Sequence, residues 1–214
     1  FDSIKGQLYK SFSLAICIDG NCSEGVENSL KEFKKYANGI NKYIIIRNSQ
    51  NLGLAKSLNK LIIYGLEQGY TLFIRADTDD TFAPERISLL LQAKLNNPHI
   101  DVIGSNYSYF GIKNGTSIMP RTHNEILHKY SYDLPIAHAS VMFDKSFFEK
   151  AGLYQSGYKD RIEDQRLWLS GFRGDCKFLN LQEVLYNVRT SQSILARRNS
   201  IKEKILIFSM KFSH

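Results

Sequence analysis

Short apolar runs alternate along the first half of the chain with longer segments in which apolar residues recur every three or four positions. Runs of the first kind occupy residues 13–19, 42–47 and 70–76. Nearly continuous apolar character over so short a length is typical of strands buried on both faces of a sheet. The segments between them, residues 23–37 and 54–67, have the apolar spacing of amphipathic helices. The pattern therefore predicts strand, helix, strand, helix and strand in this order.

The same alternation continues beyond the third predicted strand. Residues 84–96 have helical spacing and begin with Pro84, which fits the first turn of a helix, and residues 102–105 form another apolar run. Strands that alternate with helices are typical of α/β proteins with a mainly parallel sheet. Because ligands of such sheets bind at the carboxyl ends of the strands, we expect Asp19 and the acidic residues after position 76 to face one crevice.

The second half of the chain is less regular. Residues 117–133 mix loop and helix character, residues 139–143 resemble a strand, and residues 146–151 and 163–170 have helical patterns. The sequence has no internal repeat and no evident linker, so we expect one domain over residues 1–190. Its first eight residues look like the continuation of a helix that starts earlier, and we therefore expect the natural protein to have an earlier strand that this sequence lacks.

The composition is that of a soluble globular protein, with 43% hydrophobic and 23% charged residues. No apolar run approaches the ~20 residues that cross a bilayer. The first residues also lack the basic region and following apolar region of a signal peptide. We therefore expect a cytoplasmic location. Cys17, Cys22 and Cys176 form no Cys-x-x-Cys pair and no zinc-binding spacing, which indicates idle thiols in a reducing compartment.

Most of the net charge of +7 lies near the C-terminus, where residues 189–214 have six basic residues and one acidic residue. The rest of the chain is close to neutral. A nucleic-acid-binding protein more often carries basic and aromatic side chains together on its folded surface, so we expect no nucleic-acid partner. Residues 191–214 mix basic and apolar side chains, which suits peripheral contact with the inner face of the cell membrane and a solvated helix equally well.

Three aspartates, Asp77, Asp79 and Asp80, follow the third predicted strand within four residues. Their negative charges repel one another unless they share a cation. Hard carboxylate oxygens favour Mg²⁺ or Mn²⁺, so the cluster predicts a divalent metal site at the end of this strand. A solvated acidic loop is the alternative, and the position after a buried strand argues against it.

Two other kinds of metal site fit the cluster less well. An EF-hand loop needs glycine at its sixth position and glutamate at its twelfth, where this sequence has Phe82 and Ser88. A phosphatase of the haloacid dehalogenase type has an Asp-x-Asp-Gly-Thr motif after the first strand of its domain. Here Asp80 replaces the glycine and the motif follows the third predicted strand, so the phosphatase stays an alternative of lower rank.

Further motifs accompany the acidic cluster in a fixed order. They are Asn-Leu-Gly-Leu-Ala at 51–55 with Asn59, Arg-Ala-Asp-Thr-Asp-Asp at 75–80, Pro-Glu-Arg at 84–86, Pro98 with Asp-Val-Ile-Gly at 101–104, His-Ala-Ser-Val-Met-Phe at 138–143, Ala-Gly-Leu-Tyr at 151–154, Glu-Asp at 163–164 with Leu-Trp-Leu at 167–169, and Asn-Val-Arg at 187–189. Each motif alone is weak, but the ordered set is specific. Over most of its length the chain resembles the family 2 glycosyltransferases, among them bacterial enzymes of surface-polysaccharide assembly.

This resemblance implies the GT-A fold, an α/β fold with a mixed, mainly parallel sheet flanked by helices. It also implies transfer of one sugar from a nucleotide-diphosphate sugar, with a UDP-sugar expected, to a carbohydrate or lipid-linked saccharide acceptor. Asp79 and Asp80 are then expected to bind Mn²⁺ or Mg²⁺, which neutralises the leaving diphosphate. Asp77 is expected to contact the ribose or the sugar.

The resemblance places several more residues beside the donor. Asp19 stands at the second of two positions that are usually aspartate, and is expected to accept a hydrogen bond from the uracil ring. Ile18 replaces the first aspartate. Capping of the strand end by Asp19 would explain this residue without a ligand.

Asn51 and Gly53 precede a predicted helix, where glycine permits close approach of a ligand, and Asn59 completes their motif. All three are implied to lie near the donor, although capping of that helix would account for Asn51 equally well. Arg75 is also expected near the donor, and it either pairs with the acidic cluster or touches the diphosphate.

Glu163 and Asp164 form a second acidic pair. By resemblance, Asp164 is the base that removes the proton from the acceptor hydroxyl, Glu163 contacts or orients the acceptor, and the anomeric carbon inverts. Acidic residues favoured by a helix N-terminus are the alternative. His138 and Trp168 are acceptor-site candidates, although a structural histidine and a core tryptophan are simpler explanations. The Gln-x-x-Arg-Trp motif of processive members is not matched at 165–168, so we expect single addition.

The sequence therefore predicts a metal-dependent, inverting glycosyltransferase. Two alternatives remain open at this point. One is the phosphatase, and the other is a non-catalytic remnant that binds nucleotide sugars, which Ile18 and the expected missing strand both favour.

Overall fold

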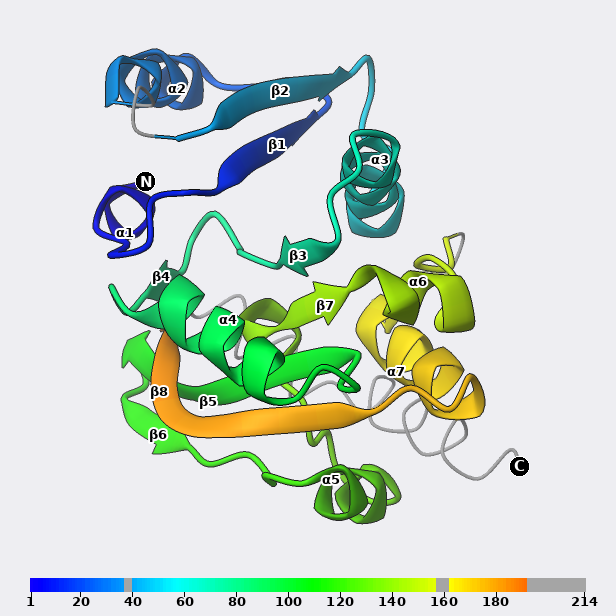
Figure 1. Cartoon of the computed structure of the whole chain (residues 1–214). Helices are drawn as coiled ribbons and strands as arrows, with labels where there is room; N and C mark the ends of the chain where they lie inside the picture. The colour runs from blue at the N-terminus through cyan, green and yellow to red at the C-terminus, as the bar shows by residue number, and fades with distance from the viewer. Residues whose placement is uncertain (37–39, 157–161, 192–214) are drawn as a thin grey trace.

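The computed structural model describes residues 1–36, 40–156 and 162–191 (Figure 1). Its elements in chain order are α1 (Asp2–Lys5), β1 (Ser13–Asp19), α2 (Glu24–Tyr36), β2 (Lys42–Asn48), α3 (Leu54–Glu67), β3 (Leu72–Ile74), β4 (Thr81–Phe82), α4 (Arg86–Asn96), β5 (Val102–Gly111), β6 (Gly115–Ser117), α5 (His123–Tyr130), the 3₁₀ turn η2 (His138–Ser140), β7 (Met142–Asp144), α6 (Lys145–Ala151), α7 (Glu163–Arg173) and β8 (Phe178–Thr190). The two alternatives for the basic C-terminal segment concern residues 192–214, which lie outside the described residues.

The strands form two sheets. β1 and β2 pair in parallel, and the larger sheet has the order β3-β7-β5-β8-β4, with β6 paired to β5. In the larger sheet β5 and β8 are parallel, whereas the pairs β3–β7, β5–β7, β5–β6 and β4–β8 are antiparallel. The expected mixed sheet is confirmed, and the two parallel pairs, β1–β2 and β5–β8, are the longest of the described strands. The antiparallel contribution comes mainly from β7, which returns from the second half of the chain, inserts between β3 and β5, and runs against both.

The smaller sheet is a separate unit in the described part of the chain. β1 pairs with β2 over seven residues, from Ser13 with Lys42 to Asp19 with Asn48, and β3 pairs only with β7. In Figure 1 the β1–β2 pair lies above the larger sheet, with α2 on one side and α3 on the other. The apolar runs at 13–19 and 42–47 are thus strands, as predicted.

The larger sheet is buried on both faces because consecutive residues of its strands point to opposite sides. Val102 of β5 belongs to a cluster that includes Phe143 and Phe178 and that packs against α6 and α7. Ile103, the next residue, packs instead with Met142 and with Leu90 of α4. Figure 1 shows α4 on one side of this sheet and α6 and α7 on the other.

The N-terminal segment is a single helical turn followed by irregular chain, rather than the longer helix expected over the first eight residues. Its anchor is Gln7, whose side chain is fully buried. The Gln7 amide donates to the carbonyl of Ala83 at 2.8 Å and accepts from the Ile87 backbone at 3.1 Å. These bonds fix the segment to the chain between β4 and α4.

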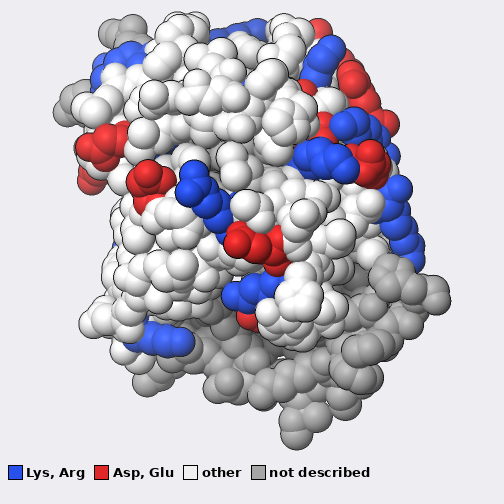
Figure 2. Space-filling view, turned by 60° about the horizontal axis from the view of Figure 1, so that its bottom comes forward, with Lys and Arg blue, Asp and Glu red and all other residues white. Residues whose placement is uncertain are grey.

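Charge on the described surface is mixed in sign. Figure 2 shows one face on which acidic and basic side chains lie intermingled among uncharged ones, with no broad area of a single sign. This agrees with the nearly neutral body inferred from the sequence. Within the described ranges, none of the helices has the length and apolar character to span a lipid bilayer.

Candidate active site

A cleft of about 760 Å³ opens where the start of α3, the turn after β3, the end of β8 and the start of α7 meet. Five acidic side chains line it, namely Asp77, Asp79, Asp80, Glu163 and Asp164, together with the basic side chains of Arg75 and Arg189. The two acidic groups that the sequence singled out are therefore in one cleft, although more than eighty residues separate them along the chain. The cleft has an excess of negative charge.

Arg75 ends β3 and lies beneath the acidic turn, with 8% of its surface exposed. Its guanidinium donates to the Asp77 carboxylate at 2.5 Å and to the Ala76 carbonyl at 2.6 Å. Burial disfavours the charged guanidinium, but the negative charge of Asp77 holds the pKa of Arg75 above its ordinary value. Of the two expected roles for Arg75, the structure supports pairing with the acidic cluster.

The turn from Asp77 to Asp80 is held by β8. The Asp77 backbone N–H donates to the Tyr186 hydroxyl at 2.9 Å, and the Arg189 backbone N–H donates to the Asp80 carboxylate at 2.7 Å. The Arg189 side chain adds a bond to the Asp79 carbonyl at 3.0 Å. Because β4 also pairs with β8, the acidic turn is fixed at both its ends.

Arg86, in the Pro-Glu-Arg motif, is a buried clamp below the same turn. Its guanidinium lies 5.0 Å from the Phe82 ring centre and 4.8 Å from that of Tyr186, and only 1% of its surface is exposed. It donates to the carbonyls of Arg75 at 2.6 Å and Ala139 at 3.0 Å. Burial lowers the pKa of Arg86 to about 10, which still leaves it charged at neutral pH. The clamp joins the end of β3 to the segment that begins at His138.

The chemistry of Asp79 and Asp80 fits a divalent metal. Partial burial, and then the charges of Asp79 and Asp77, raise the pKa of Asp80 above its ordinary value, so negative charge here is incompletely compensated. The described residues contain no group of three or more His, Cys, Asp or Glu side chains arranged to hold a metal. A metal at this turn would thus have two carboxylates as protein ligands and would need further oxygen ligands from a diphosphate or water.

Asp164 stands in the first turn of α7 and lines the same cleft as the acidic turn. Burial, and then the negative charge of Glu163, raise the pKa of Asp164 to about 6, although a bond from the Gln165 backbone and the charge of Arg75 oppose the shift. A carboxylate with this pKa is ionised at neutral pH and is a stronger base than an exposed aspartate.

His138 lines the cleft beside a buried tyrosine. Its Nε2 atom and the Tyr154 hydroxyl form a hydrogen bond of 2.6 Å. Burial, and then the positive charge of Arg75, hold the pKa of His138 well below its ordinary value, so the ring is neutral. Burial raises the pKa of Tyr154, so the phenol stays protonated. The pair is a neutral hydrogen-bonding unit at the cleft.

Four predicted site residues do not line the cleft, namely Trp168, Asn59, Asp19 and Asn51. Trp168 is completely buried and packs against Phe143 and Phe178, so the suggestion of an acceptor-binding platform is corrected to core packing. It lies on the inner face of α7, one turn from Asp164. The Asn59 side-chain amide donates to the Tyr154 carbonyl at 2.8 Å and accepts from the Tyr154 N–H at 2.9 Å. Asn59 therefore holds α3 to that segment instead of facing a donor.

The loop before α3 is fixed by Asp19. Its carboxylate accepts from the backbone of Leu52 and Gly53 and from the Asn48 side chain, each at 2.8 Å. Partial burial opposes ionisation, but these bonds hold the pKa of Asp19 below its ordinary value. Asn51 is exposed and accepts from Gly53, which has a φ of 86° and is the member of this group that lines the cleft. The predicted contact of Asp19 with uracil stays a prediction.

Sequence reasoning did not assign site roles to Tyr186, Arg189, Tyr154 and Tyr107, three of which lie beside or within recognised motifs. Tyr107 lines the cleft from β5. The available signals were the Asn-Val-Arg motif, whose arginine holds the acidic turn, and the Ala-Gly-Leu-Tyr motif, whose tyrosine bonds to His138. β8 itself was not predicted, and its contacts to the acidic turn could not be foreseen without it.

Comparison with known proteins gives a family. Residues 1–188 match the model of the family described as Glycosyl transferase family 2. A relative in Escherichia coli, UDP-Gal:alpha-D-GlcNAc-diphosphoundecaprenol beta-1,3-galactosyltransferase, is 30% identical over 87% of this chain and 66% of its own length.

Two solved structures have a similar fold. TarS of S. aureus, residues 1–349 in complex with UDP-GlcNAc, superimposes with a TM-score of 0.68 at 17% identity, covering 89% of this chain and 54% of that one. The mannosyltransferase PcManGT of Pyrobaculum calidifontis, in complex with GDP-Man and Mn²⁺, has a TM-score of 0.63 at 12% identity and covers all of this chain and 59% of that one. This chain thus spans a little over half of each solved chain, and the shared fold is GT-A.

Proposed function

The chain belongs to glycosyl transferase family 2, and on that premise we propose that it transfers one sugar from a UDP-sugar to a carbohydrate acceptor. The acceptor is a free or lipid-linked saccharide used in surface-polysaccharide assembly. The phosphatase is no longer an alternative, because the family match covers residues 1–188 and therefore includes the acidic turn.

The observation that carries the proposal is the meeting of two acidic groups in one cleft. Asp79 and Asp80 project from a turn clamped by β8, and Asp164 projects from the start of α7. Transfer requires stabilisation of a leaving diphosphate at one place and removal of a hydroxyl proton at another. A non-catalytic remnant would need only the first of these groups, so the presence of Asp164 in the cleft supports an enzyme.

The metal, when bound by Asp79 and Asp80, would supply positive charge to the diphosphate of the donor. Mn²⁺ accompanies the nucleotide sugar in the PcManGT complex, and two carboxylates with open positions suit either Mn²⁺ or Mg²⁺. Arg75 and Arg189 are the positive side chains at this end of the cleft. Arg75 holds Asp77 in place, and the role proposed for Asp77 is contact with the ribose or the sugar.

Asp164 acts on the acceptor. Its carboxylate takes the proton from the acceptor hydroxyl while that oxygen forms a bond to the anomeric carbon of the donor sugar. The bond from the anomeric carbon to the diphosphate oxygen breaks, and its electrons leave with UDP. Attack from the face opposite the leaving group inverts the anomeric carbon. Glu163 lies next to Asp164, raises its pKa and can accept a hydrogen bond from the acceptor.

UDP is the proposed nucleotide because the Escherichia coli relative is named for UDP-Gal and TarS is bound to UDP-GlcNAc. Gly53 at the start of α3 permits a phosphate-bearing ligand to approach the backbone closely. The loop that contains Gly53 is held by Asp19, which connects the end of β1 to the donor side of the cleft.

A thermal-shift experiment with UDP tests the metal site. At a UDP concentration about 100 times its Kd with Mn²⁺ present, the unfolding temperature should rise by about 5 °C or more, and it should rise little without metal. Asp79→Asn should abolish the response. Asp2→Asn, which changes a fully exposed aspartate, is the matched control and should respond as wild type. A metal-independent response to UDP would contradict the proposed roles of Asp79 and Asp80.

A further inference from the structure

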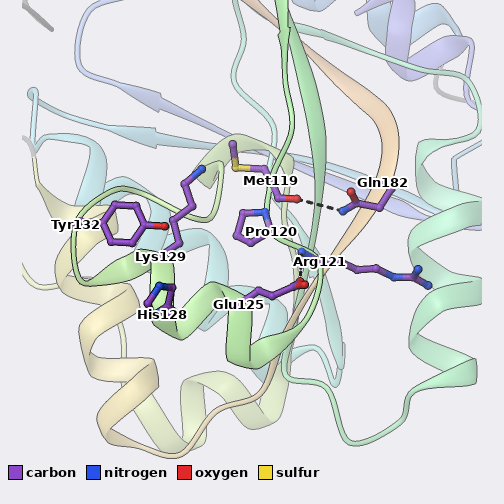
Figure 3. Close-up of a pocket in the computed structure, with 8 residues that line it drawn as sticks. All are labelled: Met119, Pro120, Arg121, Glu125, His128, Lys129, Tyr132 and Gln182. Atoms are coloured by element: carbon purple, nitrogen blue, oxygen red, sulfur yellow. Dashed lines mark hydrogen bonds between the residues drawn. The ribbon is translucent and has the colours of Figure 1, made fainter.

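A second hollow lies beside the active-site cleft, next to α5. It has a volume of about 410 Å³ and is lined by Met119, Pro120, Arg121, Glu125, His128, Lys129, Tyr132 and Gln182. Figure 3 shows these side chains around the hollow, with Tyr132 and Lys129 on one side and Gln182 on the other. We call this feature the α5 hollow. Its size is within the range of small-ligand sites, and nothing in the mechanism above uses it.

The α5 hollow adjoins the cleft that contains Asp164. Met119 lines both spaces, and it is 5% exposed, so a buried side chain forms the ridge between them. Tyr132 lines the hollow and Leu134, two residues further along the chain, lines the cleft. A chain-like ligand with one end at Asp164 can therefore cross this ridge and continue into the hollow.

Tyr132 gives the hollow an aromatic wall. It is 65% exposed, an unusual degree for a large aromatic side chain, and its ring meets that of His128 edge to face at 5.8 Å. The electron-rich face of an aromatic ring attracts the weakly positive C–H groups of a sugar ring, and the phenol hydroxyl can bond to a sugar hydroxyl. Met119 and Pro120 add apolar surface at the base.

The charges around the hollow are balanced within the protein. The Glu125 carboxylate accepts a hydrogen bond from the Arg121 backbone at 2.9 Å. Its bonds to Thr122 lower the pKa of Glu125 most, and the positive charge of Arg121 lowers it further. Lys129 pairs with Asp133 at 3.5 Å. Such pairing leaves little net charge to attract an anion, so the hollow favours a neutral ligand rich in hydroxyl groups.

Gln182 supplies polar recognition on the far side of the hollow. Its amide nitrogen donates to the carbonyls of Met119 at 3.2 Å and Asn180 at 3.3 Å, which fixes the orientation of the amide. The amide oxygen has no hydrogen bond to any described residue and can accept one from a hydroxyl group. An aromatic wall opposite a fixed hydrogen-bond acceptor suits a sugar ring with its polar edge and its apolar face.

We propose that the α5 hollow binds the acceptor's own sugars, namely those that precede the sugar whose hydroxyl is placed at Asp164. This inference rests on the proposed function, because it takes the ligand to be a saccharide acceptor. The hollow makes the enzyme select a neutral oligosaccharide over a single sugar, while the reacting hydroxyl is positioned in the cleft. Tyr132 is thus a specificity-determining residue.

Saturation-transfer NMR with neutral saccharides tests the hollow without any need for turnover. The probes are nitrophenyl monosaccharides and linear trisaccharides of glucose, galactose and N-acetylglucosamine, each added to the full chain without nucleotide. We expect at least one trisaccharide to bind wild type more tightly than its monosaccharide. Tyr132→Ala should weaken the binding of that trisaccharide by about 3- to 10-fold, and should weaken the binding of the monosaccharide much less. Tyr9→Ala, another exposed tyrosine at 37%, should bind both as wild type does.

Three results would overturn the proposal. They are no trisaccharide binding by wild type, equal effects of Tyr132→Ala on both probe lengths, and binding of inorganic pyrophosphate that Arg121→Ala removes. Circular dichroism of Tyr132→Ala must show an unfolding temperature like that of Tyr9→Ala. Failure of the proposed function looks different, because wild type would then bind trisaccharide through Tyr132 but give no thermal response to UDP and Mn²⁺.

Discussion

Asp164 is the residue on which the proposed chemistry depends, and its protonation gives the first prediction. A base must be ionised to accept a proton, so the rate of transfer at low substrate should fall about tenfold per pH unit below the pKa of about 6 and level off above it. The kcat/KM for transfer, measured from pH 4.5 to 8.5, checks this. Because the charge of Glu163 contributes to the raised pKa, Glu163→Gln should move the midpoint to lower pH.

That pH profile has a clear contrary outcome. A midpoint that does not move in Glu163→Gln would mean that the titrating group is not Asp164. Glu149→Gln, a change at an exposed glutamate of α6, should leave the midpoint where it is in wild type.

The same raised pKa predicts that Asp164 destabilises the folded protein at neutral pH. The folded state binds the Asp164 proton more tightly than the unfolded chain does, so its effect on stability is favourable only in acid and is lost as pH rises from about 4 through about 6. Asp164→Asn should therefore raise the free energy of unfolding by about 1–3 kcal/mol at pH 8. Urea unfolding at pH 8 and at pH 4 measures this, and the gain should be small at pH 4.

An equal gain at both pH values would contradict this electrostatic explanation. It would instead assign the change to packing or hydrogen bonding by the new amide. Loss of stability at pH 8 would contradict it more strongly.

β8 is the element that ties the acidic turn to the sheet, through Tyr186 and Arg189. Tyr186→Phe removes the hydroxyl that accepts the Asp77 N–H, and leaves that N–H without its 2.9 Å partner. The expected cost is about 1–2 kcal/mol of unfolding free energy, together with a smaller thermal response to UDP and Mn²⁺ because the turn is less well held. Chemical denaturation and thermal shift check the two effects.

Tyr9→Phe serves as the matched control for this change, since Tyr9 is an exposed tyrosine far along the sequence from the acidic turn. It should alter neither quantity. A Tyr186→Phe variant with wild-type stability and a wild-type UDP response would show that β8 does not support the turn through this bond.

The strands differ in how well the sequence pattern predicted their positions. The runs at 13–19 and 42–47 form β1 and β2 almost as predicted, because a continuous apolar run leaves few alternatives. The run at 70–76 yields only the strand Leu72–Ile74, since Arg75 turns to pair with Asp77. β8 was missed because its pattern of burial is interrupted by three exposed residues at 182–184, where its register with β5 shifts. A sequence pattern cannot show such an irregularity.

Among the candidate site residues, the two acidic groups line the cleft, whereas Asp19 and several motif residues do not. The acidic residues at 77–80 and 163–164 all line the cleft, because an unpaired carboxylate is stable only near water or a cation. Asn59 and Trp168 belong to motifs yet hold the structure together, Asn59 through the Tyr154 backbone and Trp168 in the core. Hydrogen bonding and packing partners of this kind become visible only in the folded chain.

At the scale of the whole molecule, the cleft brings together segments from both halves of the chain. The first half gives the start of α3 and the acidic turn, and the second half gives His138, Asp164 and the end of β8. Arg75 and Arg86 connect these parts, since Arg86 donates to carbonyls at positions 75 and 139. The proposed donor side and the proposed acceptor side are therefore built on one buried framework, and the α5 hollow adjoins the cleft at Met119.

We propose above all that Asp164 is the catalytic base of a metal-dependent sugar transfer in this cleft. The direct measurement is sugar transfer by wild type and Asp164→Asn, using UDP-Gal, UDP-GlcNAc and UDP-Glc with Mn²⁺ and the saccharide probes described above. If Asp164 is the base, wild type should transfer the sugar and Asp164→Asn should lose at least about 100-fold in rate, with an unchanged thermal response to UDP and Mn²⁺. Transfer by Asp164→Asn at the wild-type rate would contradict it.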